Sequence, residues 1–299
     1  MIPAADSTPS ALAKGERLNV HYNQVMPELP EVETVVRDLR PLLCGRRIAA
    51  VQAGRKALRR RWSKPWGTVV QGRPVLGIHR RGKWIVIELG GPYLVIHLGM
   101  TGQLRVVPAS APTPPHTHLI FTLDDDLQLR FRDVRRFGSA TLFPDAAAVQ
   151  AFFAAADLGP EPFDLDPAYW HGRVTAAHRC LKAILLDQRV VAGVGNIYAD
   201  EALFEARLHP TLLGDTLRRP QTAKLRQAVV TVLTRAIDKR GSSIRDYVGG
   251  SGEKGNYQRE FLVYGRTSQP CLRCRRPIER IVLAGRSTHF CPGCQRKPR

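Results

Sequence analysis

Two close pairs of cysteines near the carboxyl end constrain the fold most strongly. Cys271 and Cys274 form a Cys-x-x-Cys pair, and Cys291 and Cys294 form a second one after sixteen intervening residues. Paired thiolates at this spacing are typical of a tetrahedral zinc site with four cysteine ligands. Such a site has no open position for a substrate, so we predict one structural Zn²⁺ in a zinc-ribbon β-hairpin. Four free thiols are the alternative.

Residues 26–34, Met-Pro-Glu-Leu-Pro-Glu-Val-Glu-Thr, combine a helix start with two residues that a helix does not explain. A proline in the first turn and apolar residues at helical spacing predict a helix over residues 30–43. If the chain begins at Met26 and this methionine is removed, the Pro27 nitrogen becomes a secondary amine. Its pKa would be about 7.7–8.0, which makes it nucleophilic near neutral pH. The Glu28 carboxylate beside it can transfer protons.

This stretch resembles the amino terminus of the formamidopyrimidine-DNA glycosylases, bacterial repair enzymes that remove oxidised purines. The resemblance implies that the Pro27 amine is the nucleophile, that Glu28 transfers protons and that Glu31 has a supporting role. It also implies that Lys83, which follows the Arg-Arg-Gly sequence at residues 80–82, contacts the DNA backbone beside the lesion. A solvated loop is the alternative interpretation of that basic cluster.

The charge of the chain favours a polyanionic partner. Lys and Arg number 45 against 26 acidic residues among 299, which gives a net charge of +19 and a pI near 10.4. Nucleic acid is the simplest partner of this kind. A secreted basic protein is disfavoured because the cysteine spacing indicates metal binding rather than disulfides. Cys44 and Cys180 are predicted to be ordinary buried thiols.

The sequence gives no sign of a membrane or secretory destination. Its apolar runs fall short of the roughly 18–20 residues of a membrane span, and residues 1–25 lack the apolar core of a signal peptide. We therefore expect a cytoplasmic bacterial protein that is associated with the nucleoid through DNA binding. Residues 1–25 are expected to be a disordered leader or to be absent from the active protein.

Short apolar segments that alternate with Gly and Pro follow the first helix. Their length and β-branched content predict strands in a sandwich of two sheets. Three aspartates at residues 124–126 are predicted to form a hairpin turn rather than a metal site. The predicted strands are residues 47–52, 75–78, 83–89, 93–98, 103–107, 118–123, 127–131 and 139–143.

The pattern becomes helical in the second half of the chain. Residues 158–162, which contain Gly and Pro, are predicted to be the main hinge. Asp145 is a predicted cap for the helix before that hinge. The predicted helices are residues 146–156, 167–176, 180–186, 197–207 and 221–240.

Residues 191–201 read Val-Ala-Gly-Val-Gly-Asn-Ile-Tyr-Ala-Asp-Glu. Two glycines permit a tight turn, and Asn196 is predicted to cap the next helix, whose free N–H groups would form a phosphate site. The string resembles the helix–two-turn–helix element of the same family, which implies that Asn196 and Lys182 hold phosphates that flank the lesion. Arg286, near the predicted turn of the zinc hairpin, matches the family's phosphate-gripping arginine. The glycine-rich segment at residues 241–255 takes the place of the family's base-capping loop, with a flexible linker as the alternative.

Three further residues match the family's void-filling group. Met100, Arg135 and Phe137 would fill the gap left by a flipped nucleotide and probe the opposite base. The chemistry needs such residues, because C1′ is inaccessible in a stacked duplex and flipping costs on the order of a few kcal/mol. His116 lies near a strand start, where a structural role and a phosphate contact are equally consistent with the sequence.

These features predict an α+β multidomain fold. After the leader at 1–25 we expect an N-terminal catalytic β-sandwich domain at 26–157, a helix-two-turn-helix domain at 158–255 and a zinc-finger domain at 256–299. The resemblance implies the activity of a bifunctional DNA glycosylase and abasic-site lyase. As a monomer it would remove 8-oxoguanine and formamidopyrimidines from damaged double-stranded DNA, through imine formation, base release and β,δ-elimination.

Two alternatives remain. One is an endonuclease VIII-like enzyme for oxidised pyrimidines, which is disfavoured because that relative typically has glycine where this chain has Leu29. The other is a zinc-containing DNA-binding protein without catalytic activity. Charge and the zinc ribbon alone would support this second alternative equally well.

Overall fold

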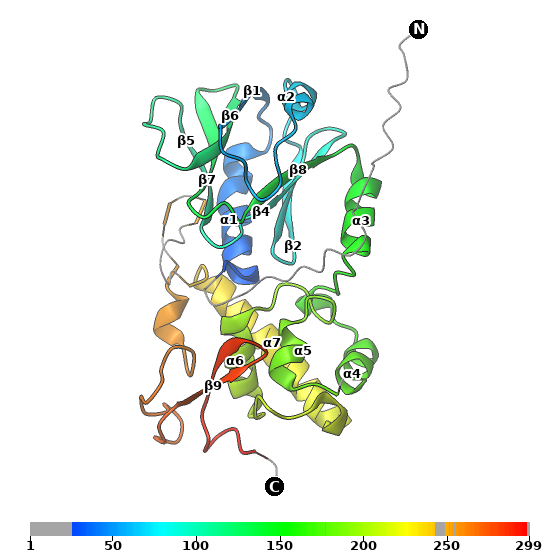
Figure 1. The fold of residues 1–299 in the computed structure, drawn as a ribbon, viewed down its shortest axis with the longest axis vertical. Helices are drawn as coiled ribbons and strands as arrows, with labels where there is room; N and C mark the ends of the chain where they lie inside the picture. Colours follow the sequence, from blue (N-terminus) through cyan, green and yellow to red (C-terminus); the bar gives the residue numbers. More distant parts are fainter. Residues whose placement is uncertain (1–25, 177, 243–248, 251, 254, 298–299) are drawn as a thin grey trace.

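The computed structural model describes residues 26–176, 178–242, 249–250, 252–253 and 255–297. Two antiparallel sheets make up one half of the molecule, and helices with a small hairpin make up the other (Figure 1). This arrangement confirms the predicted fold class. Within the described residues, no helix is long and apolar enough to cross a membrane.

The N-terminal half is a sandwich of two four-stranded sheets. One sheet has the order β1-β6-β7-β5 and the other has the order β2-β3-β4-β8. All eight predicted strands are present, with ends shifted by a few residues. Their bounds are β1 Ile48–Ala53, β2 Gly77–Arg81, β3 Trp84–Glu88, β4 Tyr93–His97, β5 Gly102–Pro108, β6 Thr117–Leu123, β7 Leu127–Asp133 and β8 Ser139–Phe143.

Turns and one short helix complete the sandwich. The predicted hairpin turn at 124–126 joins β6 to β7, which pair antiparallel, and Asp126 takes the left-handed conformation with φ 60°. Helix α2, Lys64–Val70, was not predicted. Its seven residues end in two valines and include Gly67, so they carry no helical apolar period. Pro65 at its start was the available signal.

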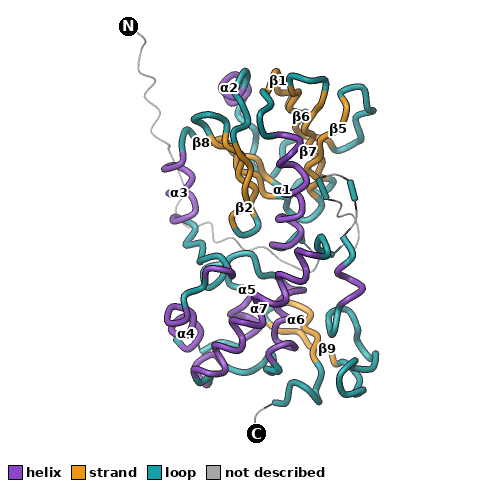
Figure 2. The backbone as a smooth tube through the Cα atoms, turned by 180° about the vertical axis from the view of Figure 1, so that it is seen from behind, coloured by secondary structure: helices purple, strands orange, loops and turns teal. Residues whose placement is uncertain are grey.

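Helix α1, Leu29–Leu43, links the two halves of the molecule (Figure 2). Its apolar face, which includes Val32, Val36 and Leu39, packs into the core of the sandwich. Leu29, at the other end, belongs to the core of the helical half. The helix therefore carries the residues just before it to the boundary between the two halves.

Four helices build the second half around a core that contains Trp170, Tyr198 and Leu203. They are α4 Pro167–Thr175, α5 Leu181–Leu186, α6 Asn196–Ala206 and α7 Arg219–Asp238. All four were predicted, and α6 and α7 pack directly against each other. Short 3-10 helices lie at Pro162–Asp164, Gly214–Thr216 and Tyr257–Glu260.

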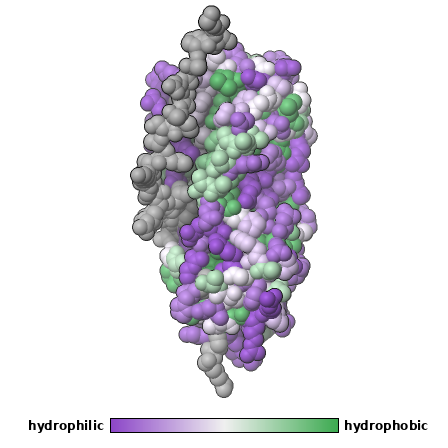
Figure 3. Space-filling view, turned by 90° about the vertical axis from the view of Figure 1, so that its right-hand side faces the viewer, coloured by the Kyte–Doolittle hydropathy of each residue, from purple (hydrophilic) through white to green (hydrophobic). Residues whose placement is uncertain are grey.

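Helix α3, Ala146–Ala155, lies on the outer face of the sheet that contains β4 and β8. Asp145 caps it as predicted, because its carboxylate accepts a hydrogen bond from the Ala148 backbone N–H at 2.8 Å. Phe152 packs on Trp84 and Phe143. Figure 3 shows the side of the molecule where α3 lies, which is largely hydrophilic with a hydrophobic area in its upper half.

A two-stranded hairpin lies against α6 near the carboxyl end. It consists of β9, Glu279–Leu283, and β10, Arg286–Phe290. Ala284 and Gly285 form the turn with φ 49° and 70°, the left-handed conformations of a tight type I′ hairpin turn. The predicted turn beside Arg286 is therefore present. Cys44 and Cys180 are half-buried free thiols, so the prediction that they are buried was only partly right.

Candidate active site

The Glu28 side chain lies at the N-terminus of α6. Its Oε1 accepts a hydrogen bond from the Ile197 N–H at 2.9 Å, and its Oε2 accepts one from the Tyr198 N–H at 3.4 Å. A carboxylate is favourable here because backbone N–H groups and the helix dipole both point toward it. Residues 28 and 197 are far apart in sequence, so the contact joins the two halves of the molecule.

This contact corrects the predicted role of Asn196 as a cap. The N-cap of α6 is Gly195, which has no side chain to cap the helix, whereas Asn196 is its first residue. The predicted phosphate site at these N–H groups is also wrong for Ile197 and Tyr198, because Glu28 already accepts their hydrogen bonds. The Oδ1 atom of Asn196 is buried and has no hydrogen-bond partner among the residues that the structure describes.

Two glycines let the loop before α6 lie directly on residues 28 and 29. A Cβ atom added to Gly195 would lie 2.3 Å from Cδ of Glu28, and one added to Gly193 would lie 2.5 Å from Cδ1 of Leu29. Gly193 also has φ +87°, which L side chains rarely adopt. The Leu29 N–H donates to the Gly193 carbonyl at 3.1 Å, which holds the loop against the start of α1.

Glu31 is buried next to Glu28 and holds the segment in place. Its Oε2 accepts the Glu28 N–H at 2.9 Å, while its Oε1 accepts the Tyr198 hydroxyl at 2.5 Å and the Ser242 N–H at 2.7 Å. Burial raises the pKa of Glu31, and these donors act in the opposite direction. Glu31 therefore fixes the backbone that carries Glu28.

Glu28 and Lys83 are both buried, and each lies near enough for its charge to affect the pKa of the other. Burial raises the pKa of Glu28 to about 7; the positive charge of Lys83 lowers it and the charge of Glu31 raises it. Burial lowers the pKa of Lys83, although both carboxylates favour its charged form. The Lys83 ammonium donates to the Val194 carbonyl at 3.1 Å. A carboxyl group with a pKa near neutrality can both give and take a proton under physiological conditions.

The basic cluster before Lys83 binds the segment that joins the two halves. Arg80 donates to the Glu161 carboxylate at 2.6 Å, Arg81 does so at 3.1 Å and the Gly82 N–H does so at 2.7 Å. The alternative of a solvated loop is therefore wrong for this cluster. Glu161 holds the turn that carries Lys83.

The predicted void-filling residues lie on two neighbouring turns. The guanidinium of Arg135 stacks 4.7 Å above the ring of Phe137, which is 45 % exposed. Met100 is half-buried in the turn between β4 and β5. Asp133 joins the turns, because it accepts the Thr101 hydroxyl at 2.5 Å and the Gly138 N–H at 2.7 Å.

The remaining predicted DNA contacts differ in exposure. His116 is exposed, with φ 69°. Arg286 is half-buried at the start of β10. Lys182 is fully buried and donates to Asp200 at 2.6 Å and to the Asn196 carbonyl at 2.8 Å. Most of the predicted base-capping segment, at 243–248, 251 and 254, lies outside the described residues.

His97, at the end of β4, was not among the predicted site residues. Burial lowers its pKa to about 3, and the charges of Lys83 and Arg59 act in the same direction. Its Nδ1 accepts the Gly99 N–H at 3.0 Å, so the neutral ring carries its proton on Nε2 as a donor. The signal was weak because a histidine at the end of an apolar run is equally typical of a core position.

The four clustered cysteines fit a zinc ion. Their sulfur atoms all lie within 4.8 Å of one another, and the Sγ atoms of Cys271 and Cys294 are 3.9 Å apart. Tetrahedral coordination with Zn–S bonds of about 2.3 Å places sulfurs roughly 3.8 Å apart. One structural Zn²⁺ is therefore confirmed, with Cys271, Cys274, Cys291 and Cys294 as the predicted ligands.

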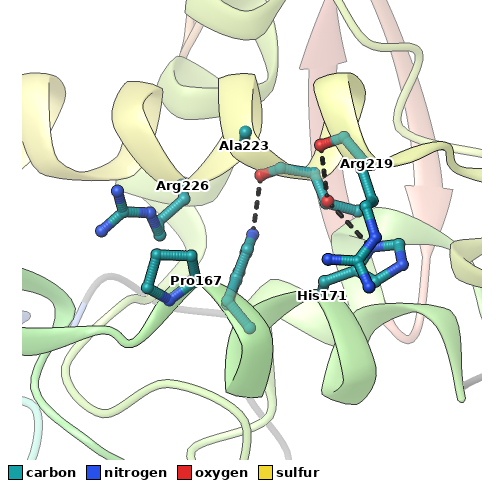
Figure 4. A pocket seen from close by; sticks show the side chains of 7 residues that line it. Pro167, His171, Arg219, Ala223 and Arg226 are labelled. Atoms are coloured by element: carbon teal, nitrogen blue, oxygen red, sulfur yellow. Dashed lines mark hydrogen bonds between the residues drawn. The ribbon is translucent and has the colours of Figure 1, made fainter.

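A separate shallow hollow of about 190 Å³ lies between α4 and α7 (Figure 4). Pro167, His171, Arg219 and Arg226 are among its lining residues. None of the residues lining this hollow belongs to the Glu28–Lys83 site.

The two-sheet sandwich, the helical half and the zinc hairpin match, in this order, the domains of one family of DNA glycosylases. Three family models match the chain: the formamidopyrimidine-DNA glycosylase N-terminal domain at residues 26–140, its H2TH domain at 158–248, and the zinc finger found in FPG and IleRS at 268–296. The chain belongs to the formamidopyrimidine-DNA glycosylase family.

Individual relatives agree with this assignment. The formamidopyrimidine-DNA glycosylase of Burkholderia mallei is 43 % identical over 277 residues, which cover 91 % of this chain and all of the relative. That of Cytobacillus firmus is 40 % identical over 90 % of this chain and all of the relative.

Solved structures give the same result. A Lactococcus lactis Fpg complex with DNA that contains an abasic site has a TM-score of 0.84 at 37 % identity and covers 90 % of this chain and all of that one. A complex of MutM with DNA that contains carbocyclic 8-oxo-G has a TM-score of 0.83 at 37 % identity and covers 91 % of this chain and all of that one.

Proposed function

We propose that this protein excises oxidised purines from duplex DNA and then cleaves the abasic site. The observation that carries the proposal is the buried Glu28 carboxyl group, which directly follows Pro27 in the chain. Glu28 places a proton-transferring carboxyl group directly after the proposed nucleophile, and the Lys83 ammonium is near enough to Glu28 to affect its pKa. Relatives named formamidopyrimidine-DNA glycosylase, and solved complexes of similar proteins with damaged DNA, support the substrate class.

The first chemical step is attack of the Pro27 nitrogen on C1′ of the damaged nucleotide. The N–C1′ bond forms as the bond from C1′ to the base breaks, and the base leaves with the bonding electrons. Glu28, with a pKa of about 7, supplies a proton at the sugar and later takes one back. Loss of the amine proton and opening of the sugar give an iminium at C1′.

The iminium then acts as an electron sink. Loss of a proton from C2′ expels the 3′ phosphate, and a second elimination expels the 5′ phosphate. Hydrolysis frees Pro27 and leaves a one-nucleotide gap. In this scheme Lys83 contacts the phosphate beside the lesion, and the neutral His97 donates from Nε2 to the same backbone.

The nucleophile assignment requires a free amine. In the 299-residue chain the Pro27 nitrogen is part of a tertiary amide, which has no available lone pair for imine formation. We therefore propose that the reactive form begins at Pro27. The family match, which starts at residue 26, supports this proposal.

On the DNA side, Met100, Arg135 and Phe137 would occupy the gap left by the flipped nucleotide. Arg286, Asn196 and His116 would contact the backbone. Because Lys182 is fully buried, we propose that it acts on DNA only indirectly, by holding the first turn of α6. The protein would act as a monomer in the cytoplasm.

Competition between lesions tests the substrate assignment. Single-turnover excision should be faster for 8-oxoguanine opposite cytosine, and for formamidopyrimidines, than for thymine glycol in the same sequence. The purine preference rests on Leu29, which packs against Gly193, and on the Arg135–Phe137 pair. Faster excision of thymine glycol would place the protein with the enzymes for oxidised pyrimidines.

A further inference from the structure

The zinc hairpin is tied to α6 by a buried contact between Asp200 and His289. We propose that these two residues are positioning residues that hold Arg286 in a fixed relation to the N-terminus of α6. The inference rests on the proposed role of Arg286 as a phosphate contact. It adds a connection through which the zinc hairpin and α6 bind the DNA backbone as one unit.

Asp200 lies at the centre of this connection. Its Oδ1 accepts the Lys182 ammonium at 2.6 Å, and the side chains of both residues are 0 % exposed. Its Oδ2 accepts the backbone N–H of His289 at 2.8 Å and its Nδ1–H at 3.1 Å. Both carboxylate oxygens are thus used, one toward α5 and the other toward β10.

The same cluster fixes the start of α6. Lys182 also donates to the carbonyl of Asn196, the first residue of α6, at 2.8 Å. A buried charge that loses its partner costs several kcal/mol, so the cluster favours one arrangement over all others. Asn196 and His289 are therefore held at a set separation through Lys182 and Asp200.

The two strands of the hairpin need a stabilising contact beyond the zinc-binding end, such as the one between His289 and Asp200. A two-stranded hairpin is at best marginally stable in isolation. Near the zinc site, Gln295 donates to the Leu208 carbonyl at 2.9 Å and Arg273 donates to Glu205 at 2.6 Å. These contacts anchor the base of the hairpin to the C-terminal end of α6, whereas His289 lies on β10 itself, three residues from Arg286.

Arg286 in turn lies near Lys83. Burial lowers the pKa of Lys83, and the charge of Arg286 is near enough to lower it further. Tyr264 lies between the two elements, because its ring contacts His289 edge-on at 5.0 Å, and both the Asn196 side chain and the charge of Arg286 affect its pKa. Rotation of the hairpin about its zinc-binding end would therefore move Arg286 relative to Glu28 and Lys83.

A double-mutant cycle tests the proposal in the zinc-loaded protein. Arg286→Ala is introduced into the wild type and into three backgrounds: His289→Phe, His289→Asn and His209→Phe. Phenylalanine keeps an aromatic ring but loses the Nδ1–H that donates to Asp200. Asparagine keeps a donor, because its side-chain amide can replace that Nδ1–H. His209 is a matched control, because it is as buried as His289, at 6 % exposed, and packs on Phe290 of the same strand.

The readout is the dissociation constant for a duplex with a tetrahydrofuran abasic analogue, with zinc content measured for each variant. Arg286→Ala should weaken binding about tenfold in the wild type, as loss of one charge-assisted contact does, and equally in His289→Asn and His209→Phe. In the His289→Phe background Arg286 is already misplaced, so Arg286→Ala should weaken binding only about threefold or less. The same cost in all four backgrounds would overturn the proposal.

Two further outcomes are decisive. If Arg286→Ala leaves wild-type binding unchanged, Arg286 is not a phosphate contact, and the inference fails together with that assignment. If His289→Phe loses zinc, the paired replacement of Lys182→Met with Asp200→Leu serves instead, because removing both charges leaves none unpaired. In that background the cost of Arg286→Ala should again fall to about threefold or less, and an undiminished cost would contradict the proposal.

Discussion

The Glu28 carboxylate occupies the space that a side chain at position 195 would need. A Cβ atom on Gly195 would lie 2.3 Å from Cδ of Glu28 and 2.5 Å from its Oε1. The glycine is thus required by the Glu28 carboxylate, which comes from the other half of the molecule. The motif at 191–201 therefore accommodates Glu28.

Gly195→Ala should displace Glu28 and abolish most of the base-release activity. We expect a loss of about 2–3 kcal/mol in stability, because both the close contact and the hydrogen bonds at the start of α6 are disturbed. Gly172→Ala is the control, since a Cβ there meets nothing within 4 Å and the residue lies inside α4. It should stabilise the fold by about 0.5–1 kcal/mol. Denaturant titrations and single-turnover excision measure both effects.

Glu28 should make stability depend on pH between its unfolded and folded pKa values. The unfolded carboxyl group loses its proton near pH 4.5, whereas the folded one keeps it to about pH 7. Folding therefore takes up a proton in this window, so the stabilising contribution is complete below pH 4.5 and is lost as the pH rises through about 7.

Glu28→Gln lacks this ionisation and should gain stability relative to the wild type as the pH rises. The gain should be about 3 kcal/mol between pH 4.5 and 7.5. Urea unfolding of both proteins at several pH values measures the difference. A constant difference across this range would show that the carboxyl group is ionised throughout.

Glu161→Gln should weaken the hydrogen bonds and ion pairs that hold the turn that carries Lys83. We expect a loss of about 1–3 kcal/mol, because the buried Arg80 and the partly buried Arg81 lose their shared anionic partner. Excision should slow as Lys83 becomes less well placed. Glu279→Gln, at an exposed position on β9, is the control and should change neither property.

Cys291→Ser should release zinc and weaken DNA binding while the sandwich stays folded. The hairpin loses one of four ligands, and closed sites of this type depend on all of them. Cys180→Ser is the matched control, because its thiol lies outside the cluster. Zinc retained at one equivalent in Cys291→Ser, with unchanged affinity, would contradict the ligand assignment.

Local patterns predicted the elements well because each pattern has a local cause. Short apolar segments that alternate with Gly and Pro located all eight strands, and the paired cysteines located the zinc hairpin. Helix α2 was missed because its seven residues carry no apolar period. The residues of the reaction site were proposed from motifs, and their assignments as catalytic or DNA-binding stay predictions.

Long-range partners could not be predicted from local patterns. Nothing near Asn196 in the sequence indicates that Glu28, from the first domain, would take the N–H groups that a cap or a phosphate would otherwise use. The same holds for Glu161, whose partners lie about eighty residues earlier in the chain. Such contacts depend on how the two halves meet, which the sequence pattern does not encode directly.

The central claim is that the Pro27 nitrogen forms the covalent intermediate. Borohydride reduction during reaction with 8-oxoguanine DNA should trap a chain that begins at Pro27, and peptide mapping should place the adduct on that residue. A chain extended to Met1, with Pro27 inside it, should bind the same DNA yet give no trapped product. Efficient trapping of the extended chain, with the adduct on a lysine, would contradict the mechanism.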